Sequence, residues 1–161
     1  MLGLELYENL TNCTAAPYAS YLLKKDNMTD LDLQNAKDLI RMSEDQFTFW
    51  DIVPNEHGVK RFAAPCVVEQ YKYWTPVDAS AHNVLMAFLD LYEATGDKLA
   101  FAKAKALIDN MTVVQNKCSG QMPTTWDLRS PEREGRRTFW TNCTWASVTA
   151  LLRMAELTEN Q

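Results

Sequence analysis

Apolar residues recur along the chain at the three- and four-residue spacing that marks one face of a helix. The pattern Val84-Leu85-Phe88-Leu91 returns 66 residues later as Ala150-Leu151-Met154-Leu157. A second echo lies upstream of each copy, where Ala36-Lys37-Asp38-Leu39-Ile40 is matched by Ala104-Lys105-Ala106-Leu107-Ile108 at an offset of 68. Two echoes at nearly one spacing predict a repeated unit of two helices, and such repeats bear on the whole architecture.

Local signals set the expected ends of these helices. Thr29-Asp30 predicts a helix start, Gly96 a left-handed stop, and Asp97 a cap for the helix that follows at once. In the stretch 73–78, we predict Thr75 as N-cap, with Pro76 at the first helical position and Asp78 two residues further. Thr141 occupies the same place in the second copy. The expected helices are 15–23, 30–50, 76–94, 98–115 and 142–158.

The connections between these helices alternate in length. Residues 96–97 form a tight turn, which requires the flanking helices to be antiparallel neighbours, whereas 51–72 and 116–140 are long loops. No strand pattern is evident. We therefore predict an all-α fold in a single domain, 1–161, with a poorly defined segment 1–28 and about two α-hairpin repeats over 29–161. On helix 98–115 the expected buried positions are Leu99, Ala102, Ala106, Ile108 and Val113.

Composition narrows the function. The net charge of −5 and pI near 5.0 argue against a nucleic-acid partner. No apolar run reaches the ~20 residues of a membrane span, and the first residues lack a signal-peptide pattern, so we expect no membrane association and a cytoplasmic location by default. A periplasmic location stays open if the chain is a fragment. Four scattered cysteines and two histidines give no metal motif, and we expect no cofactor.

Four stretches resemble the six-hairpin glycosidase superfamily of (α/α) toroids, which includes many bacterial carbohydrate-processing enzymes. They are Ser43-Glu44-Asp45-Gln46-Phe47, the run 68–78, Leu91-Tyr92-Glu93-Ala94-Thr95-Gly96-Asp97, and Gly120-Gln121-Met122-Pro123-Thr124-Thr125-Trp126. The resemblance implies inner helices 78–95 and 142–158, outer helices 30–50 and 98–115, and sugar binding on the long-loop face.

The length departs from that family. At a period of 66 residues, 161 residues hold only about 2.4 of the six hairpins. The chain thus resembles the C-terminal part of a longer protein. We expect it to complete its core either as a homo-oligomer or by contact with the missing hairpins.

Glycoside hydrolysis uses two carboxylates that flank the scissile bond. On the long-loop side, the candidates are Glu69, Asp78 and Asp127. Each has a structural alternative: Asp78 as part of a helix cap, and Glu69 and Asp127 as members of loop salt bridges with Lys72 or Arg129.

Side chains for holding a sugar lie close to these carboxylates in the sequence. Tyr71 and Tyr73 follow Glu69, and Trp126 precedes Asp127, so aromatic faces are available for stacking. Arg129 lies in a charged loop and is a candidate contact for an acidic sugar, although such a loop also serves simply as a solvated surface.

These observations predict part of a carbohydrate-active toroid protein of glycoside hydrolase type. Two alternatives stay open. One is a non-catalytic helical module for binding or oligomerisation, or an inactive remnant of a larger enzyme. The other is an epimerase or isomerase on the same type of toroid, for which the chain has few histidines.

Overall fold

The computed structural model describes residues 15–50, 65–69, 75–76, 78–124 and 141–159, and this part of the chain is mostly helical. Its helices are α2 (Ala15–Leu23), α3 (Asp30–Phe47), α4 (Asp78–Thr95), α5 (Lys98–Val114) and α6 (Thr141–Glu159). Three short strands accompany them: β1 (Thr48–Phe49), β2 (Cys66–Glu69) and β3 (Thr75–Pro76). The helices thus follow the predicted order and differ from the predicted bounds by at most three residues.

Side-chain caps fix the first turns of α3 and α5. Thr29 accepts a hydrogen bond from the backbone of Asp32, and the Asp32 carboxylate accepts one from the backbone of Thr29, which completes a capping box. Lys25 and Thr29 together lower the pKa of Asp32 to about 2. Asp97 caps α5 by accepting from two backbone N–H groups, after Gly96 has taken the left-handed conformation with φ of 72°. These predicted ends of α3, α4 and α5 are confirmed.

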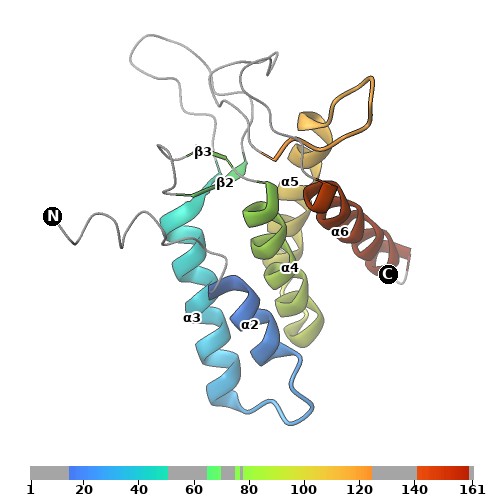
Figure 1. Ribbon diagram of the computed structural model, residues 1–161. Helices are drawn as coiled ribbons and strands as arrows, with labels where there is room; N and C mark the ends of the chain where they lie inside the picture. Colours follow the sequence, from blue (N-terminus) through green and yellow to red (C-terminus); the bar gives the residue numbers. More distant parts are fainter. Residues whose placement is uncertain (1–14, 51–64, 70–74, 77, 125–140, 160–161) are drawn as a thin grey trace, which may run out of the picture.

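Helix α4 lies at the centre of the molecule. It packs against α2 and α3 on one side and α6 on the other, while α5 runs antiparallel to it after the tight turn (Figure 1). Helices α2, α4 and α6 run in one direction, and α3 and α5 run in the other (Figure 1). The arrangement therefore contains two hairpins, α2–α3 and α4–α5, with α6 placed against the second.

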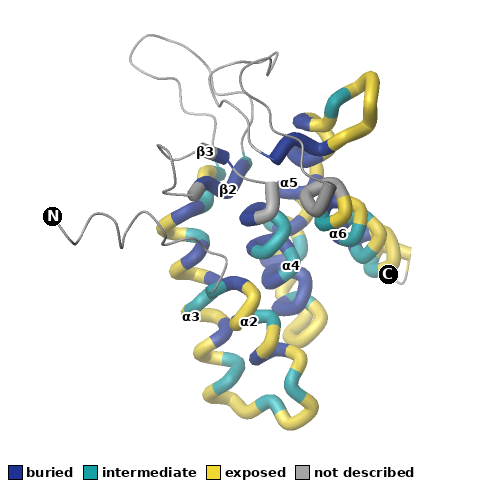
Figure 2. The backbone as a smooth tube through the Cα atoms, in the orientation of Figure 1, coloured by how far each residue is buried: buried dark blue, intermediate teal, exposed yellow. Residues whose placement is uncertain are grey.

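The sequence of α4 explains its central place. Its interior is apolar nearly all round, as expected for a helix with neighbours on several sides. Val84, Leu85, Phe88 and Leu89 are buried, and in Figure 2 the α4 tube is largely dark blue. At roughly 1.5–3 kcal/mol for each fully buried large side chain, this helix contributes much of the hydrophobic stabilisation. From α6, Ala150 and Met154 enter the same core.

A small antiparallel sheet corrects the expectation that the chain has no strands. The order is β1-β2-β3, with Thr48 opposite Val67 and Glu69 opposite Thr75. The residues of β2, Cys-Val-Val-Glu, include two β-branched side chains that suit a strand, but four residues are too few to show an alternating pattern. Part of the predicted loop 51–72 is therefore a strand.

The same sheet corrects the predicted start of α4. Thr75 and Pro76 pair with β2 and so do not form the first turn of the helix, which begins at Asp78. Threonine followed by proline is compatible with a helix start and with an edge strand alike, because proline at the edge has no N–H to leave unpaired. The pairing of Thr75 and Pro76 with β2 decides in favour of the strand.

The buried face of α5 also differs from the prediction. Leu99, Ala102 and Val113 are exposed, and Ile108 is the predicted position that is buried. Ala106 is half-buried. The buried residues follow a regular helical stripe: Ala100, Ala104, Leu107, Ile108, Met111 and Val114, with Asn110 beside it. Alanines lie on several sides of α5, so its sequence distinguishes only weakly between an apolar and a polar face. Which face of α5 is buried therefore depends on the neighbouring helices.

Candidate functional site

Two of the predicted site residues, Glu69 and Asp78, lie at the end of the molecule where α3 finishes and α4 begins (Figure 1). Glu69 and Asp78 are described by their backbone alone: Glu69 ends β2, and Asp78 is the first residue of α4. The five others, Tyr71, Tyr73, Trp126, Asp127 and Arg129, lie outside the described residues. Their roles stay predictions.

The backbone around these positions is nevertheless well anchored. Glu69 pairs with Thr75, and Asp78 follows three residues later. The two predicted catalytic residues therefore belong to one short ladder and to the first residue of the helix that follows it. Val114, at the end of α5, packs against Cys66 and Val68 of β2 in a small apolar cluster. This cluster ties the end of α5 to the sheet.

The segment after α5 stays close to this end of the molecule. Asn116 accepts hydrogen bonds from two backbone N–H groups in a turn that closes at Gly120, which has φ of 72°. Met122 and Thr124 are buried, and Thr124 is the last described residue before Trp126 and Asp127. Three chain segments that carry candidate residues therefore start from one structured region.

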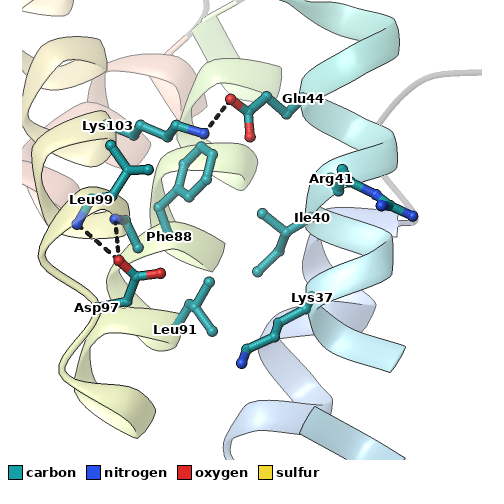
Figure 3. Close-up of a pocket in the computed structure, with 10 residues that line it drawn as sticks. Lys37, Ile40, Arg41, Glu44, Phe88, Leu91, Asp97, Leu99 and Lys103 are labelled. Carbon is teal, nitrogen blue, oxygen red and sulfur yellow. Dashed lines mark hydrogen bonds and ion pairs between the residues drawn. The ribbon is translucent and has the colours of Figure 1, made fainter. Parts of the chain in front are cut away.

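A separate groove lies between α3 and the α4–α5 hairpin (Figure 3). Ile40, Phe88 and Leu91 line its apolar floor, and its volume is about 220 Å³. That is below the roughly 300–1,000 Å³ of ordinary ligand pockets. Lys37 points from α3 toward the α4–α5 hairpin, whereas the Arg41 side chain extends away from the groove (Figure 3).

Both carboxylates of the groove are already engaged. Glu44 forms an ion pair with Lys103, whose ammonium also lies 5.6 Å from the centroid of the Trp50 ring and 5.5 Å from that of Phe88. Asp97 caps α5. The groove therefore serves to join α3 to α5 and offers no pair of available carboxylates for acid–base chemistry.

A buried charge cluster joins three helices at the other flank of α4. The Asp90 side chain is 1% exposed, and it pairs with Lys24, after α2, at 3.0 Å and with Arg153 of α6. Arg153 also pairs with Glu93, one turn further along α4. Sequence reasoning missed this cluster, although an aspartate within the apolar run Ala87-Phe88-Leu89-Asp90-Leu91 is a signal of a buried, paired charge.

His82 is a packing residue of the α4–α6 contact. Its ring forms a hydrogen bond with the backbone of Ala146, and its Nδ1 is buried without a partner among the described residues. Burial lowers the pKa of His82, against the opposing effect of that hydrogen bond. The side chain therefore favours the neutral form and contributes to helix packing.

Among the described residues, no group of histidine, cysteine and carboxylate side chains is arranged to hold a metal ion. Within the same ranges, no helix has the length and apolar character needed to cross a membrane. Comparison with known protein families, with curated proteins and with solved structures finds no match to this chain.

Proposed function

We propose that this chain is part of a carbohydrate-active (α/α) toroid protein that binds a sugar at the end where β2, β3 and the start of α4 lie, with glycoside hydrolysis as its chemistry. One observation carries the proposal. The ladder between Glu69 and Thr75 and the apolar contact of Val114 with Cys66 and Val68 bring β2, β3 and the end of α5 together, next to the start of α4. Binding sites are commonly built on such connecting segments, held by a rigid helical scaffold.

The order of the helices supports the toroid part of the proposal. Helices α2, α4 and α6 form a row that runs in one direction, and α3 and α5 run in the opposite direction (Figure 1). In a toroid of α-hairpins the first row would be the inner layer and the second the outer layer. The resemblance assigns α4 and α6 to the inner layer, and the packing of α2 on α4 adds a third member.

In this proposal, Glu69, Asp78 and Asp127 supply the acid and the base or nucleophile. Tyr71, Tyr73 and Trp126 stack on the sugar, and Arg129 binds a carboxylate of an acidic sugar. One carboxyl must be protonated to donate to the leaving oxygen, and aromatic neighbours favour this by raising its pKa.

The test is hydrolysis across a panel of neutral and acidic oligosaccharides, measured with the full chain. We expect Glu69→Gln to reduce turnover at least about a hundredfold, the usual contribution of one acid–base group. Asp109→Asn is the matched control, because Asp109 is an exposed carboxylate on α5 that pairs with Lys105. Turnover that is unchanged by Glu69→Gln, Asp78→Asn and Asp127→Asn would refute the assignment.

A second candidate function is that of a non-catalytic helical module that binds another protein. The observation that favours it is the exposed apolar stripe along α6. Sugar binding without hydrolysis would favour a lectin-like version of the first candidate. If the chain neither binds nor hydrolyses any sugar of the panel, the protein-binding module is the candidate that is left.

A further inference from the structure

Helix α6 turns a row of large apolar side chains toward solvent. Trp145 is 73% exposed, Val148 is 41% exposed and Leu152 is 61% exposed. Their spacing of three and four residues places them on one face of the helix. We call this surface, with Glu156 and Glu159 at its C-terminal end, the outer α6 face.

The internal repeat shows what kind of surface this is. At the offset of 66 residues, Val148 and Leu152 correspond to His82 and Met86 of α4. Those two α4 residues contact α6: His82 through the backbone of Ala146, and Met86 through a contact of 3.9 Å between its Sδ and the Arg153 guanidinium. The outer α6 face is therefore the equivalent of the α4 surface that receives α6.

The charges follow the same correspondence. Asp90 and Glu93 hold Arg153 on the α4 surface. At the offset of 66 residues, they correspond to Glu156 and Glu159, which are both exposed acidic residues. On both surfaces, two packing positions four residues apart are thus followed by two acidic positions in the same order and spacing: His82 and Met86 on α4 correspond to the apolar Val148 and Leu152 on α6. The outer α6 face matches a helix that brings a positive charge to Glu159, at the C-terminal end of this face.

We propose that the outer α6 face binds an α-helix of a partner protein that runs parallel to α6. The helix presents small residues at positions i and i+4 and an arginine at i+7. This is the face that α6 itself turns toward α4, where Ala146, Ala150 and Arg153 have that spacing. The direction follows from α4 and α6, which run the same way (Figure 1). The proposal belongs to the second candidate function and does not depend on sugar binding.

The probe is a fluorescently labelled synthetic peptide of residues 141–159, because it carries the required face. Binding to the full chain is measured by fluorescence anisotropy. We expect saturable binding that Leu152→Glu in the full chain weakens at least about tenfold. Leu152 is exposed, so this variant should keep the fold, which circular dichroism checks. Absence of binding at peptide concentrations up to about 1 mM would overturn the proposal.

A charge exchange provides the second, independent arm. Glu159→Arg in the chain should weaken binding of the unmodified peptide, and a peptide with Arg153→Glu should recover it. The peptide could instead bind by replacing the chain's own α6 on α4. Binding of that kind would not be weakened by either substitution in the chain, because Leu152 and Glu159 face away from α4. Binding that ignores both substitutions would thus overturn the proposal.

Sedimentation velocity of the chain alone tests whether a second copy of the chain, and not a separate partner, covers the outer α6 face. We expect a monomer whose sedimentation is unchanged by Leu152→Glu. A dimer at micromolar concentration that Leu152→Glu dissociates, and with which the peptide competes, would show that a second copy covers the face and would refute a separate partner.

Discussion

The buried cluster around Asp90 gives the sharpest stability prediction. Replacing Arg153 by methionine keeps much of the apolar stem but removes the charge that neutralises Asp90. The Asp90 side chain is 1% exposed, and its other partner, Lys24, is 56% exposed and so is screened by water. Breaking a buried pair from one side costs roughly 3–5 kcal/mol, and the remaining lysine puts this case at about 3 kcal/mol.

The converse substitution should cost less. Asp90→Asn removes the buried charge itself, and Arg153, which is 16% exposed, still pairs with Glu93. We expect a loss of about 1.5–2 kcal/mol, at the lower end of the range for a hydrogen bond with a charged partner. In the double variant D90N/R153M, the loss should be at least about 1 kcal/mol smaller than the sum of the single losses, since the arginine has no buried charge left to neutralise.

Urea unfolding followed by circular dichroism measures these free energies of unfolding. Arg41→Met is the matched control: Arg41 is an exposed arginine whose pair with Asp38, at 3.4 Å, lies on the surface of α3. Its loss should be under about 1 kcal/mol. An Arg153→Met loss no larger than that of the control, or additive single losses, would refute the view that α6 neutralises Asp90.

Three further predictions concern packing, a turn and pH. Leu107→Ala should destabilise the chain by about 2–5 kcal/mol in urea, and Leu99→Ala on the exposed side of α5 by under about 0.5 kcal/mol; equal losses would contradict the observed face. Gly96→Ala should lower stability by about 1 kcal/mol because φ is 72°, and Gly96→Asn by less, since asparagine tolerates this conformation; a neutral alanine would contradict the turn geometry. Burial lowers the pKa of His82 from 6.5, so below about pH 6.5 the unfolded chain binds a proton that the folded chain resists. Stability should therefore fall as the pH drops below about 6.5, and His82→Gln should flatten that fall; an unchanged slope would exclude this histidine as its source.

Local chemistry made most helix ends predictable. Thr29, Gly96 and Asp97 act within a few residues of their own positions, so their effect can be read from the adjacent sequence. The start of α4 could not be read in this way. Thr75 and Pro76 carry the signals of a helix cap, and their pairing with Val68 and Glu69 depends on a contact across the fold.

Features that depend on the packing of several helices could not be predicted from the sequence. Ala102 and Ala104 are identical in chemistry, yet the first is exposed and the second is buried, because α4 covers one side of α5. The pairing of Asp90 with residues from either side of α4 likewise requires three elements to converge. Of the predicted site, the structure describes the backbone of Glu69 and Asp78. The catalytic roles of Glu69, Asp78 and Asp127 stay predictions.

The short ladder also bears on how this protein can change in evolution. Thr48 pairs with Val67, and Glu69 pairs with Thr75, so both intervening segments have their ends fixed by backbone hydrogen bonds. Lengthening a closed loop costs little free energy, about 0.6 kcal/mol for each doubling. Insertions between these pairs can therefore change the length and side chains of the two segments while α3 and α4 keep their spacing, so that the sequence can diversify here at little cost to the helical core.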